Sequence, residues 1–103
     1  MLRRMISRWR APVGRPLPLV LYTRAECHLC EVMKAEIDRV AARRPLALTE
    51  VDIDSDPELV ERYGRSIPVL EIAGRVAFKG KLTSAELERK LLRRARELES
   101  AAE

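Results

Sequence analysis

Residues 18–33 read Pro-Leu-Val-Leu-Tyr-Thr-Arg-Ala-Glu-Cys-His-Leu-Cys-Glu-Val-Met, and this stretch decides the fold. Its first six residues, Pro18–Thr23, form a short apolar run opened by proline, which predicts a buried strand. The only two cysteines, Cys27 and Cys30, follow as a C-x-x-C where the strand gives way to a helical pattern. The amino end of a helix has free N–H groups and a partial positive charge, and both favour a thiolate. The motif at this place therefore predicts a redox site.

The composition indicates one small globular domain. The chain has 103 residues, of which 47% are hydrophobic and 35% are charged, and this suffices for one core. No apolar run approaches the roughly 20 residues that span a bilayer, so we predict no membrane span. Two cysteines are too few for a disulfide-stapled secreted framework, and no secretory h-region is visible. We therefore expect a cytoplasmic protein, in which a C-x-x-C is catalytic or metal-binding.

Positive charge is concentrated at the amino end. Residues 1–17 hold five arginines and no acid, whereas the rest of the chain holds 15 basic and 16 acidic residues. We expect residues 1–17 to be a disordered basic tail, residues 18–99 to form the domain and residues 100–103 to be a second tail. Contact of the arginine-rich tail with a membrane surface or nucleic acid is an alternative, as is an organellar transit peptide. The domain has no basic stripe, so we predict that it binds no nucleic acid.

A helix and a second strand follow the cysteines. Apolar residues recur at spacings of three and four, which predicts a helix over residues 28–43 with one apolar face. The apolar positions are Leu29, Val32, Met33, Ile37, Val40 and Ala41. Pro45 ends the helix, and residues 46–53 read as a strand. Two strands joined by a helix favour a parallel right-handed crossover.

Capping and turn signals define the second half of the chain. An Asp-Pro start predicts a short helix over residues 57–63. Strand-like runs at 68–72 and 75–78, joined by Ala-Gly, predict an antiparallel hairpin. A capping box at Thr83 begins the last helix. The order βαβαββα predicts an α/β fold, a four-stranded mixed sheet with helices on both faces.

This order and its motifs resemble the glutaredoxin branch of the thioredoxin-like superfamily, over about residues 18–98. The resemblance depends on Cys27-His28-Leu29-Cys30, on Ser66-Ile67-Pro68, and on the Ala73-Gly74 turn followed by Gly80 and Thr83. Two further segments, Val51-Asp52-Ile53-Asp54-Ser55-Asp56 and Arg62-Tyr63-Gly64, look like those of the small bacterial glutaredoxin-like proteins. The resemblance implies a thioredoxin-like fold and a role in redox homeostasis. It also implies a thiol–disulfide oxidoreductase that reduces mixed disulfides of proteins or low-molecular-weight thiols.

The two cysteines have different expected roles. Cys27, at the helix start, is the predicted nucleophile, with a pKa below the free value of about 8.5. Cys30 lies one turn further on, and we expect it to be the more buried, resolving thiol. His28 is a modulating residue if its imidazolium stabilises the thiolate, and an exposed residue without a partner otherwise. The carboxylates of Glu26 and Glu31 oppose thiolate formation.

The resemblance also implies residues that bind the substrate or its thiol. It predicts a cis peptide bond between Ile67 and Pro68 that pairs with an extended substrate, whereas a simpler reading makes Pro68 a strand start. It places Arg24 at a position that contacts a glutathione carboxylate, with a solvated loop charge as the alternative. The family's Gly-Gly-x-x-Asp region is altered in this chain, which keeps only its second glycine, Gly80. Backbone N–H groups between Gly80 and the helix start at Thr83 could still receive a carboxylate. No cofactor is expected to be bound, and glutathione or another low-molecular-weight thiol is the expected co-substrate.

Two other functions compete with catalysis. A zinc or iron–sulfur site needs about four ligands, so only a dimer that shares two C-x-x-C pairs could complete one. We expect a monomer and no metal site in one chain. The third reading is a non-catalytic binding module whose thiols are incidental. Covalent haem in its usual form is excluded, because Glu31 rather than histidine follows the motif.

Overall fold

The structure is a computed structural model that describes residues 16–102. Residues 1–15, which hold most of the predicted basic tail, lie outside the described residues, as does Glu103. The elements are β1 (Leu17–Thr23), α2 (His28–Ala41), β2 (Leu46–Asp52), η1 (Ile53–Ser55), α3 (Pro57–Tyr63), β3 (Val69–Ile72), β4 (Arg75–Lys79) and α4 (Ser84–Ala102). Among these residues, no helix is long and apolar enough to cross a bilayer.

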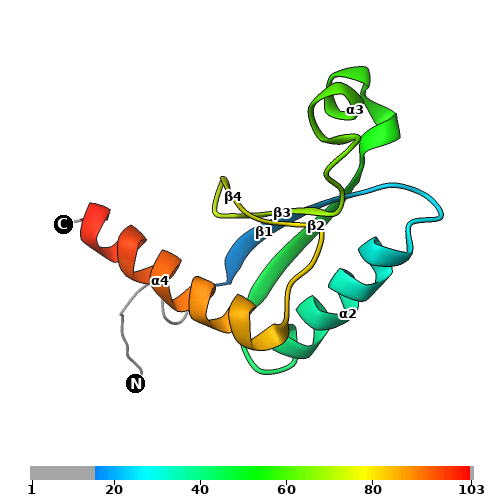
Figure 1. The fold of residues 1–103 in the computed structure, drawn as a ribbon. Helices are drawn as coiled ribbons and strands as arrows, with labels where there is room; N and C mark the ends of the chain where they lie inside the picture. Colours follow the sequence, from blue (N-terminus) through cyan, green and yellow to red (C-terminus); the bar gives the residue numbers. More distant parts are fainter. Residues whose placement is uncertain (1–15, 103) are drawn as a thin grey trace.

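The sheet has four strands in the order β2-β1-β3-β4 (Figure 1). Strand β1 runs parallel to β2, while β3 is antiparallel to both β1 and β4. Helices α2 and α4 lie on one side of the sheet, and the short helix α3 lies on the other. The predicted mixed sheet with helices on both faces is therefore confirmed. In the parallel pair, Thr23 is opposite Asp52, so the loops after β1 and β2 leave the same edge of the sheet.

The sheet divides the hydrophobic core into two parts. The larger part, under α2 and α4, consists of Leu19, Leu21, Met33, Ile37, Val40, Leu70, Ile72, Leu82, Leu87 and Leu91. The smaller part, on the α3 side, consists of Ile53, Tyr63 and Val69. Full burial of one such aliphatic side chain contributes about 1.5–3 kcal/mol, so the larger part dominates the stability. It also fixes α2, and with it the cysteines, against the sheet.

The apolar face predicted for α2 is only partly buried. Met33, Ile37 and Val40 are fully buried, but Leu29 is 51% exposed and Val32 is 41% exposed. The first turns of α2 extend beyond the cover that α4 provides over the rest of the helix (Figure 1). Apolar surface is therefore left in solvent next to the cysteines.

The start of β1, the start of β3 and the end of β4 each differ by one residue from the prediction, and three other element ends also differ. Helix α2 ends at Ala41 rather than residue 43, because the N–H groups of Arg43 and Arg44 both donate to the Val40 carbonyl. Residue 53 lies in η1 rather than in a strand, because the Asp52 carboxylate accepts the Asp54 N–H and starts a turn. Helix α4 continues to Ala102, so most of the predicted tail at 100–103 is helical.

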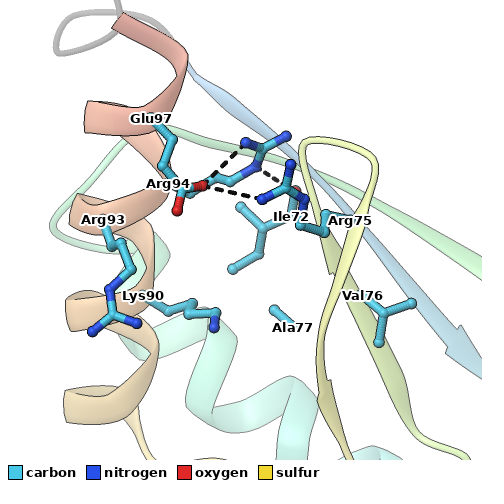
Figure 2. Close-up of a pocket in the computed structure, with 8 residues that line it drawn as sticks. All are labelled: Ile72, Arg75, Val76, Ala77, Lys90, Arg93, Arg94 and Glu97. Carbon is cyan, nitrogen blue, oxygen red and sulfur yellow. Dashed lines mark hydrogen bonds and ion pairs between the residues drawn. The ribbon is translucent and has the colours of Figure 1, made fainter. Parts of the chain in front are cut away.

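Arg94 fastens α4 to the β3–β4 hairpin (Figure 2). Its guanidinium donates to the carbonyls of Ile72 and Ala73, at 3.3 and 2.9 Å. Glu97 accepts from Arg94 and from Arg75, at 3.2 and 3.4 Å, and so bridges the helix and the hairpin. A small cavity of about 60 Å³ lies between these elements. These contacts hold the hairpin turn, in which Ala73 and Gly74 both have positive φ.

Candidate redox site at the start of helix α2

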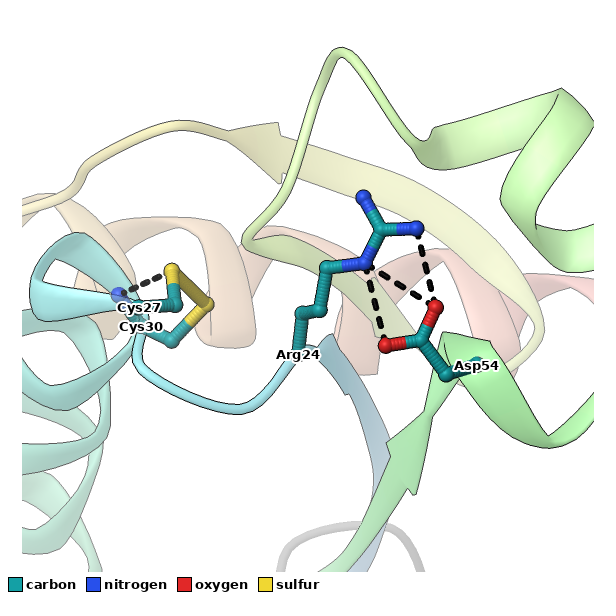
Figure 3. The surroundings of a disulfide bond; sticks show 4 residues. All are labelled: Arg24, Cys27, Cys30 and Asp54. Carbon is teal, nitrogen blue, oxygen red and sulfur yellow. Dashed lines mark hydrogen bonds and ion pairs between the residues drawn. A yellow bond between two sulfur atoms is a disulfide. The ribbon is translucent and has the colours of Figure 1, made fainter.

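Cys27 is the N-cap residue of α2 (Figure 3). Its backbone is extended, with φ −112° and ψ 103°, and its Sγ accepts the N–H of Cys30 at 3.1 Å. The two cysteines form a disulfide, with their Cα atoms 5.2 Å apart. Cys30 is buried at 5% exposure, whereas Cys27 is partly exposed. The prediction that Cys27 starts the helix and that Cys30 is the more buried is confirmed.

The loop between β1 and α2 turns sharply before the cysteines. Glu26 has φ 57°, in the left-handed region that a residue with a side chain seldom adopts. Such a conformation costs of order 1–3 kcal/mol and persists where the surrounding structure holds it. The turn places Cys27 at the helix start with its sulfur directed along the first turn.

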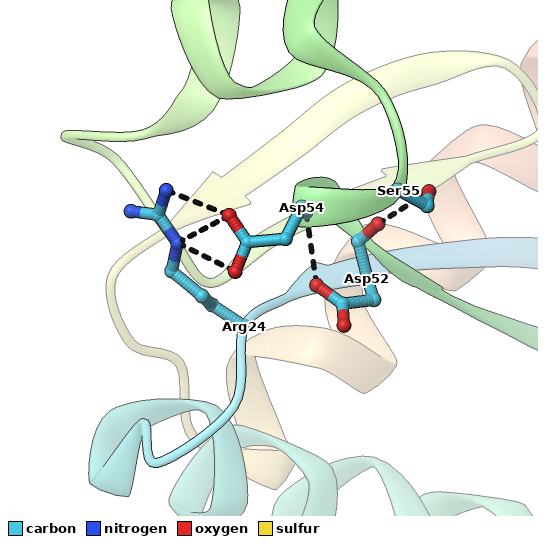
Figure 4. A network of polar contacts seen from close by, with 4 residues as sticks. All are labelled: Arg24, Asp52, Asp54 and Ser55. Carbon is cyan, nitrogen blue, oxygen red and sulfur yellow. Dashed lines mark hydrogen bonds and ion pairs between the residues drawn. The ribbon is translucent and has the colours of Figure 1, made fainter.

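Arg24 anchors this loop to the segment after β2 (Figure 4). Its Nε donates to both carboxylate oxygens of Asp54 at 3.1 Å, and its Nη2 donates to Oδ1 at 2.9 Å. The hydrogen bond raises the pKa of Arg24 and holds the pKa of Asp54 below its ordinary value. The Asp54 N–H in turn donates to Asp52. The guanidinium predicted to hold a ligand carboxylate therefore holds a carboxylate of its own chain.

A surface cavity of about 460 Å³ opens beside the disulfide. Both cysteines line it, together with Thr23, Arg24, Ala25, Glu26, Glu31, Lys34, Ala35, Asp38 and Glu50. Lys34 pairs with Asp38 at 3.3 Å and with Glu50 at 3.5 Å, and its hydrogen bond to Asp38 raises the pKa of Lys34. Glu26 and Glu31 form no ion pair within residues 16–102. The cavity is therefore acidic.

The peptide bond between Ile67 and Pro68 is cis, as the resemblance predicts. Pro68 is buried, and its carbonyl accepts the Gly80 N–H at 2.8 Å. Gly80 has φ 87°, which a glycine adopts without strain. The Ile67 N–H donates to the Tyr63 carbonyl at 3.2 Å, so this donor is already used within the chain. Ile67 itself packs against the smaller core cluster.

The start of α4 has the predicted capping box. The Thr83 N–H donates to the Glu86 carboxylate at 2.9 Å, and the Glu86 N–H donates to the Thr83 hydroxyl at 3.1 Å. The next N–H, of Ser84, donates to the Glu36 carboxylate of α2 at 2.7 Å. Three N–H groups at this helix start, those of Thr83, Ser84 and Glu86, are therefore taken by side chains of the chain, although this start was predicted to receive a carboxylate.

His28, the first residue of α2, has an exposed side chain. It forms no hydrogen bond or ion pair with the part of the chain that the structure describes, and it lies outside the cavity lining. Within residues 16–102 there is also no group of three or more His, Cys, Asp or Glu residues that could hold a metal ion.

The sequence did not point to two residues near the site. Asp54 forms the ion pair with Arg24, and Glu36 accepts the Ser84 N–H. Asp54 could have been found, because a parallel pairing of the first two strands brings the residues just after each strand to one edge. Glu36 could not, because its partner lies 48 residues away on a different element.

The chain matches the family model of the glutaredoxin-like domain (DUF836) over residues 18–92. No curated protein matches its sequence at a significant level. Among solved structures, it is 28% identical to protein Ne2328 from Nitrosomonas europaea, with a TM-score of 0.64 over 73% of this chain and 91% of that one. It is 32% identical to protein XcR50 from X. campestris, with a TM-score of 0.61 over 71% and 93%.

A relative with a redox name is desulfothioredoxin from Desulfovibrio vulgaris Hildenborough, solved in its reduced form. The chain is 30% identical to it, with a TM-score of 0.57 over 76% of this chain and 81% of that one. Thioredoxins at 16–20% identity share the fold. A C-x-x-C after β1, a cis proline before β3, a thioredoxin-like sheet and a family model over most of the domain agree with one another. The chain therefore belongs to the glutaredoxin-like domain (DUF836) family.

Proposed function

We propose that the chain is a thiol–disulfide oxidoreductase that uses Cys27 and Cys30 to reduce mixed disulfides of proteins or low-molecular-weight thiols. One observation carries the proposal. The sulfur of Cys27 occupies the N-cap of α2, accepts a backbone N–H of the first turn and is bonded to the buried Cys30. A helix start stabilises a thiolate at that position, and the thiolate is the form that attacks disulfides.

The reaction has two balanced steps. In the reduced chain, the Cys27 thiolate attacks one sulfur of the substrate disulfide, forms a mixed disulfide and releases the other half as a thiolate. The Cys30 thiol then loses its proton, attacks the Cys27 sulfur and releases the second half of the substrate. Two electrons pass to the substrate, and the chain is left with the Cys27–Cys30 disulfide. A thiol of glutathione type or a dithiol reductant returns it to the dithiol form.

Surface features beside the cysteines support a polypeptide as one substrate. Leu29 and Val32 expose apolar side chains on the first turns of α2. The residue before the cis proline, Ile67, has its N–H engaged, so a substrate strand would pair with its carbonyl alone. We assign His28 a modulating role only, through its charge near the helix start. We propose the reducing cytoplasm as the compartment and a monomer as the working form.

Neither competing function has an observation in its favour. A metal or iron–sulfur site shared by two copies and a non-catalytic binding module stay alternative predictions from the sequence, and we do not propose them.

The direct test follows one turnover of the full chain. The chain is reduced, freed of reductant and mixed with bis(2-hydroxyethyl) disulfide, which carries no charge. We expect release of the small thiol, with formation of the Cys27–Cys30 disulfide seen by mass spectrometry of the peptides. Glu88→Gln, on α4 beside the carboxyl end of α2, is the control and should react at the wild-type rate. If the reduced chain leaves the small disulfide intact, the proposed function is wrong.

A further inference from the structure

We propose that the redox site selects disulfides with positive charge beside the reacting sulfur, as in a polypeptide with lysine or arginine next to its cysteine, over anionic thiols such as glutathione. Asp54 is the specificity-determining residue in this proposal. The inference rests on the proposed exchange reaction and adds the class of substrate.

The cation beside the cysteines, Arg24, is already paired within the chain. Arg24 lines the cavity with the cysteines, and an arginine in this place could hold a carboxylate with two parallel hydrogen bonds. Here Asp54 already occupies that geometry, with three contacts of 2.9–3.1 Å (Figure 3). An anionic substrate would have to displace an internal carboxylate that is held at no cost in binding entropy. Arg24 therefore offers little attraction to an anion.

Backbone N–H groups that follow the cis proline are also engaged within the chain. Free N–H groups at a helix start bind carboxylates. In this chain the Thr83 N–H is taken by Glu86 and the Ser84 N–H by Glu36. The Gly80 N–H is taken by the Pro68 carbonyl. At the two positions where the resemblance places its carboxylates, a small anionic thiol thus finds the Arg24 Nε and the N–H groups of Gly80, Thr83 and Ser84 already engaged.

The side chains that line the cavity set the charge that a substrate meets there. Four carboxylates line the cavity, Glu26, Glu31, Asp38 and Glu50, against the two cations Arg24 and Lys34. Both cations are paired, Arg24 with Asp54 and Lys34 with Asp38 and Glu50. Glu26 and Glu31 flank the C-x-x-C and have no ion pair within the described residues. The lining therefore carries a net negative charge, and such a cavity concentrates cationic ligands and raises their association rates.

The test compares small disulfides that differ in charge. The reduced full chain is mixed, in single turnover, with cystamine (cationic), bis(2-hydroxyethyl) disulfide (neutral) or oxidised glutathione (anionic). Each rate is divided by that of free dithiothreitol with the same disulfide. The dithiothreitol thiolate is negative and so itself favours the cationic disulfide. Dividing by its rate therefore lowers the expected ratio rather than raising it. We expect cystamine to exceed oxidised glutathione by about tenfold at low salt. The ratio should shrink in about 1 M salt, where screening acts within about 3 Å.

Variants then separate Asp54 from the overall charge. Asp54→Asn should raise the rate with oxidised glutathione several-fold relative to the rate with the neutral disulfide, because it frees Arg24. Glu88→Gln makes the same change in net charge on α4, where Glu88 pairs with Arg43 and Arg44 just after the carboxyl end of α2, and should leave the three rates unchanged. Each variant is compared with wild type on the same disulfide, so intrinsic reactivity cancels.

The outcomes distinguish this inference from the proposed function. Equal normalised rates for the three disulfides in wild type would overturn the inference, whether or not Asp54→Asn folds. A faster reaction with oxidised glutathione than with cystamine would also overturn it. Failure with the neutral disulfide as well would instead overturn the proposed function.

Discussion

Helices α2 and α4 begin with the same arrangement but with different atoms. At the start of α4, the Thr83 hydroxyl accepts the Glu86 N–H at 3.1 Å. At the start of α2, the Cys27 sulfur accepts the Cys30 N–H, also at 3.1 Å. In both cases a side chain at the N-cap receives an N–H from the residue three positions later. The oxygen at α4 is chemically inert, whereas the sulfur at α2 is redox-active.

The two helix starts separate stability from chemistry in this fold. At the start of α4, the N–H groups of Thr83, Ser84 and Glu86 are bonded to side chains, two of them to carboxylates, and no group there can ionise into a nucleophile. The start of α2 has a sulfur in place of the oxygen caps that helices prefer, and an exposed cavity beside it. Every helix start is partly positive. At α4 this partial charge is used for stability, and at α2 it holds a thiolate. Substitutions at the two starts should therefore affect different measurements.

The largest effect is expected for Cys27→Ser, which makes the start of α2 resemble that of α4. Serine is a good N-cap, so the helix should form and the free energy of unfolding should stay within about 1 kcal/mol of the reduced wild type. Exchange with a neutral disulfide should fall by at least about a thousandfold, since the nucleophile is lost. Stopped-flow kinetics and urea unfolding measure the two quantities. Retained exchange would assign the nucleophile elsewhere.

Cys30→Ser should separate the two steps of exchange. The Cys27 thiolate remains, so the first half of the substrate should leave, but the mixed disulfide should then persist. Intact-mass measurement should show one covalent adduct per chain and one equivalent of released thiol. Release of both halves of the substrate would show that Cys30 is not the resolving thiol.

Thr83→Ala should act on stability alone. It removes the N-cap oxygen of α4 and should lower the free energy of unfolding by about 1 kcal/mol. The matched variant Thr83→Ser keeps a capping oxygen and should lose much less. Exchange rates of both variants should equal that of wild type. A large loss of exchange in Thr83→Ala would tie the start of α4 to the redox site.

Glu31→Gln should show how a neighbouring carboxylate affects the thiolate at the start of α2. Glu31 lies in the first turn of α2 and lines the cavity with both cysteines. Removing its charge favours the thiolate, so the pKa of the Cys27 thiol should fall by less than about 1 unit. The ultraviolet absorbance of the thiolate against pH measures it, with Glu88→Gln as control. A rise of that pKa would contradict the expected sign.

The smallest effect concerns the loop that leads into α2. The hydrogen bond from Arg24 lowers the pKa of Asp54 in the folded chain, so the pair stabilises the fold above the ordinary aspartate range. That contribution is lost as pH falls through the lowered pKa, and it is small because both side chains are exposed. Carboxyl-carbon NMR of Asp54 should give a titration midpoint below the ordinary 3.8. A midpoint at or above it would mean that the pair does not persist in solution.

Local signals explain which parts of the fold could be predicted from the sequence. Helix α3 was predicted with its observed ends, because an Asp-Pro start specifies where it begins. The hairpin and the capping box at Thr83 also depend on neighbouring residues. Exposure of Leu29 could not be predicted, because helical period gives a face but not how far α4 covers it. The state of Arg24 likewise depends on Asp54, 30 residues away, and on the register of two strands.

The most direct measurement is limited alkylation of the reduced full chain with iodoacetamide, across pH, with each modified cysteine located by mass spectrometry. If the start of α2 holds a reactive thiolate, Cys27 should be modified first, with a half-maximal rate at a pH below about 8.5. Buried Cys30 should follow only slowly. Modification of Cys30 first, or of both cysteines only above that pH, would contradict the assignment of Cys27 as the nucleophile.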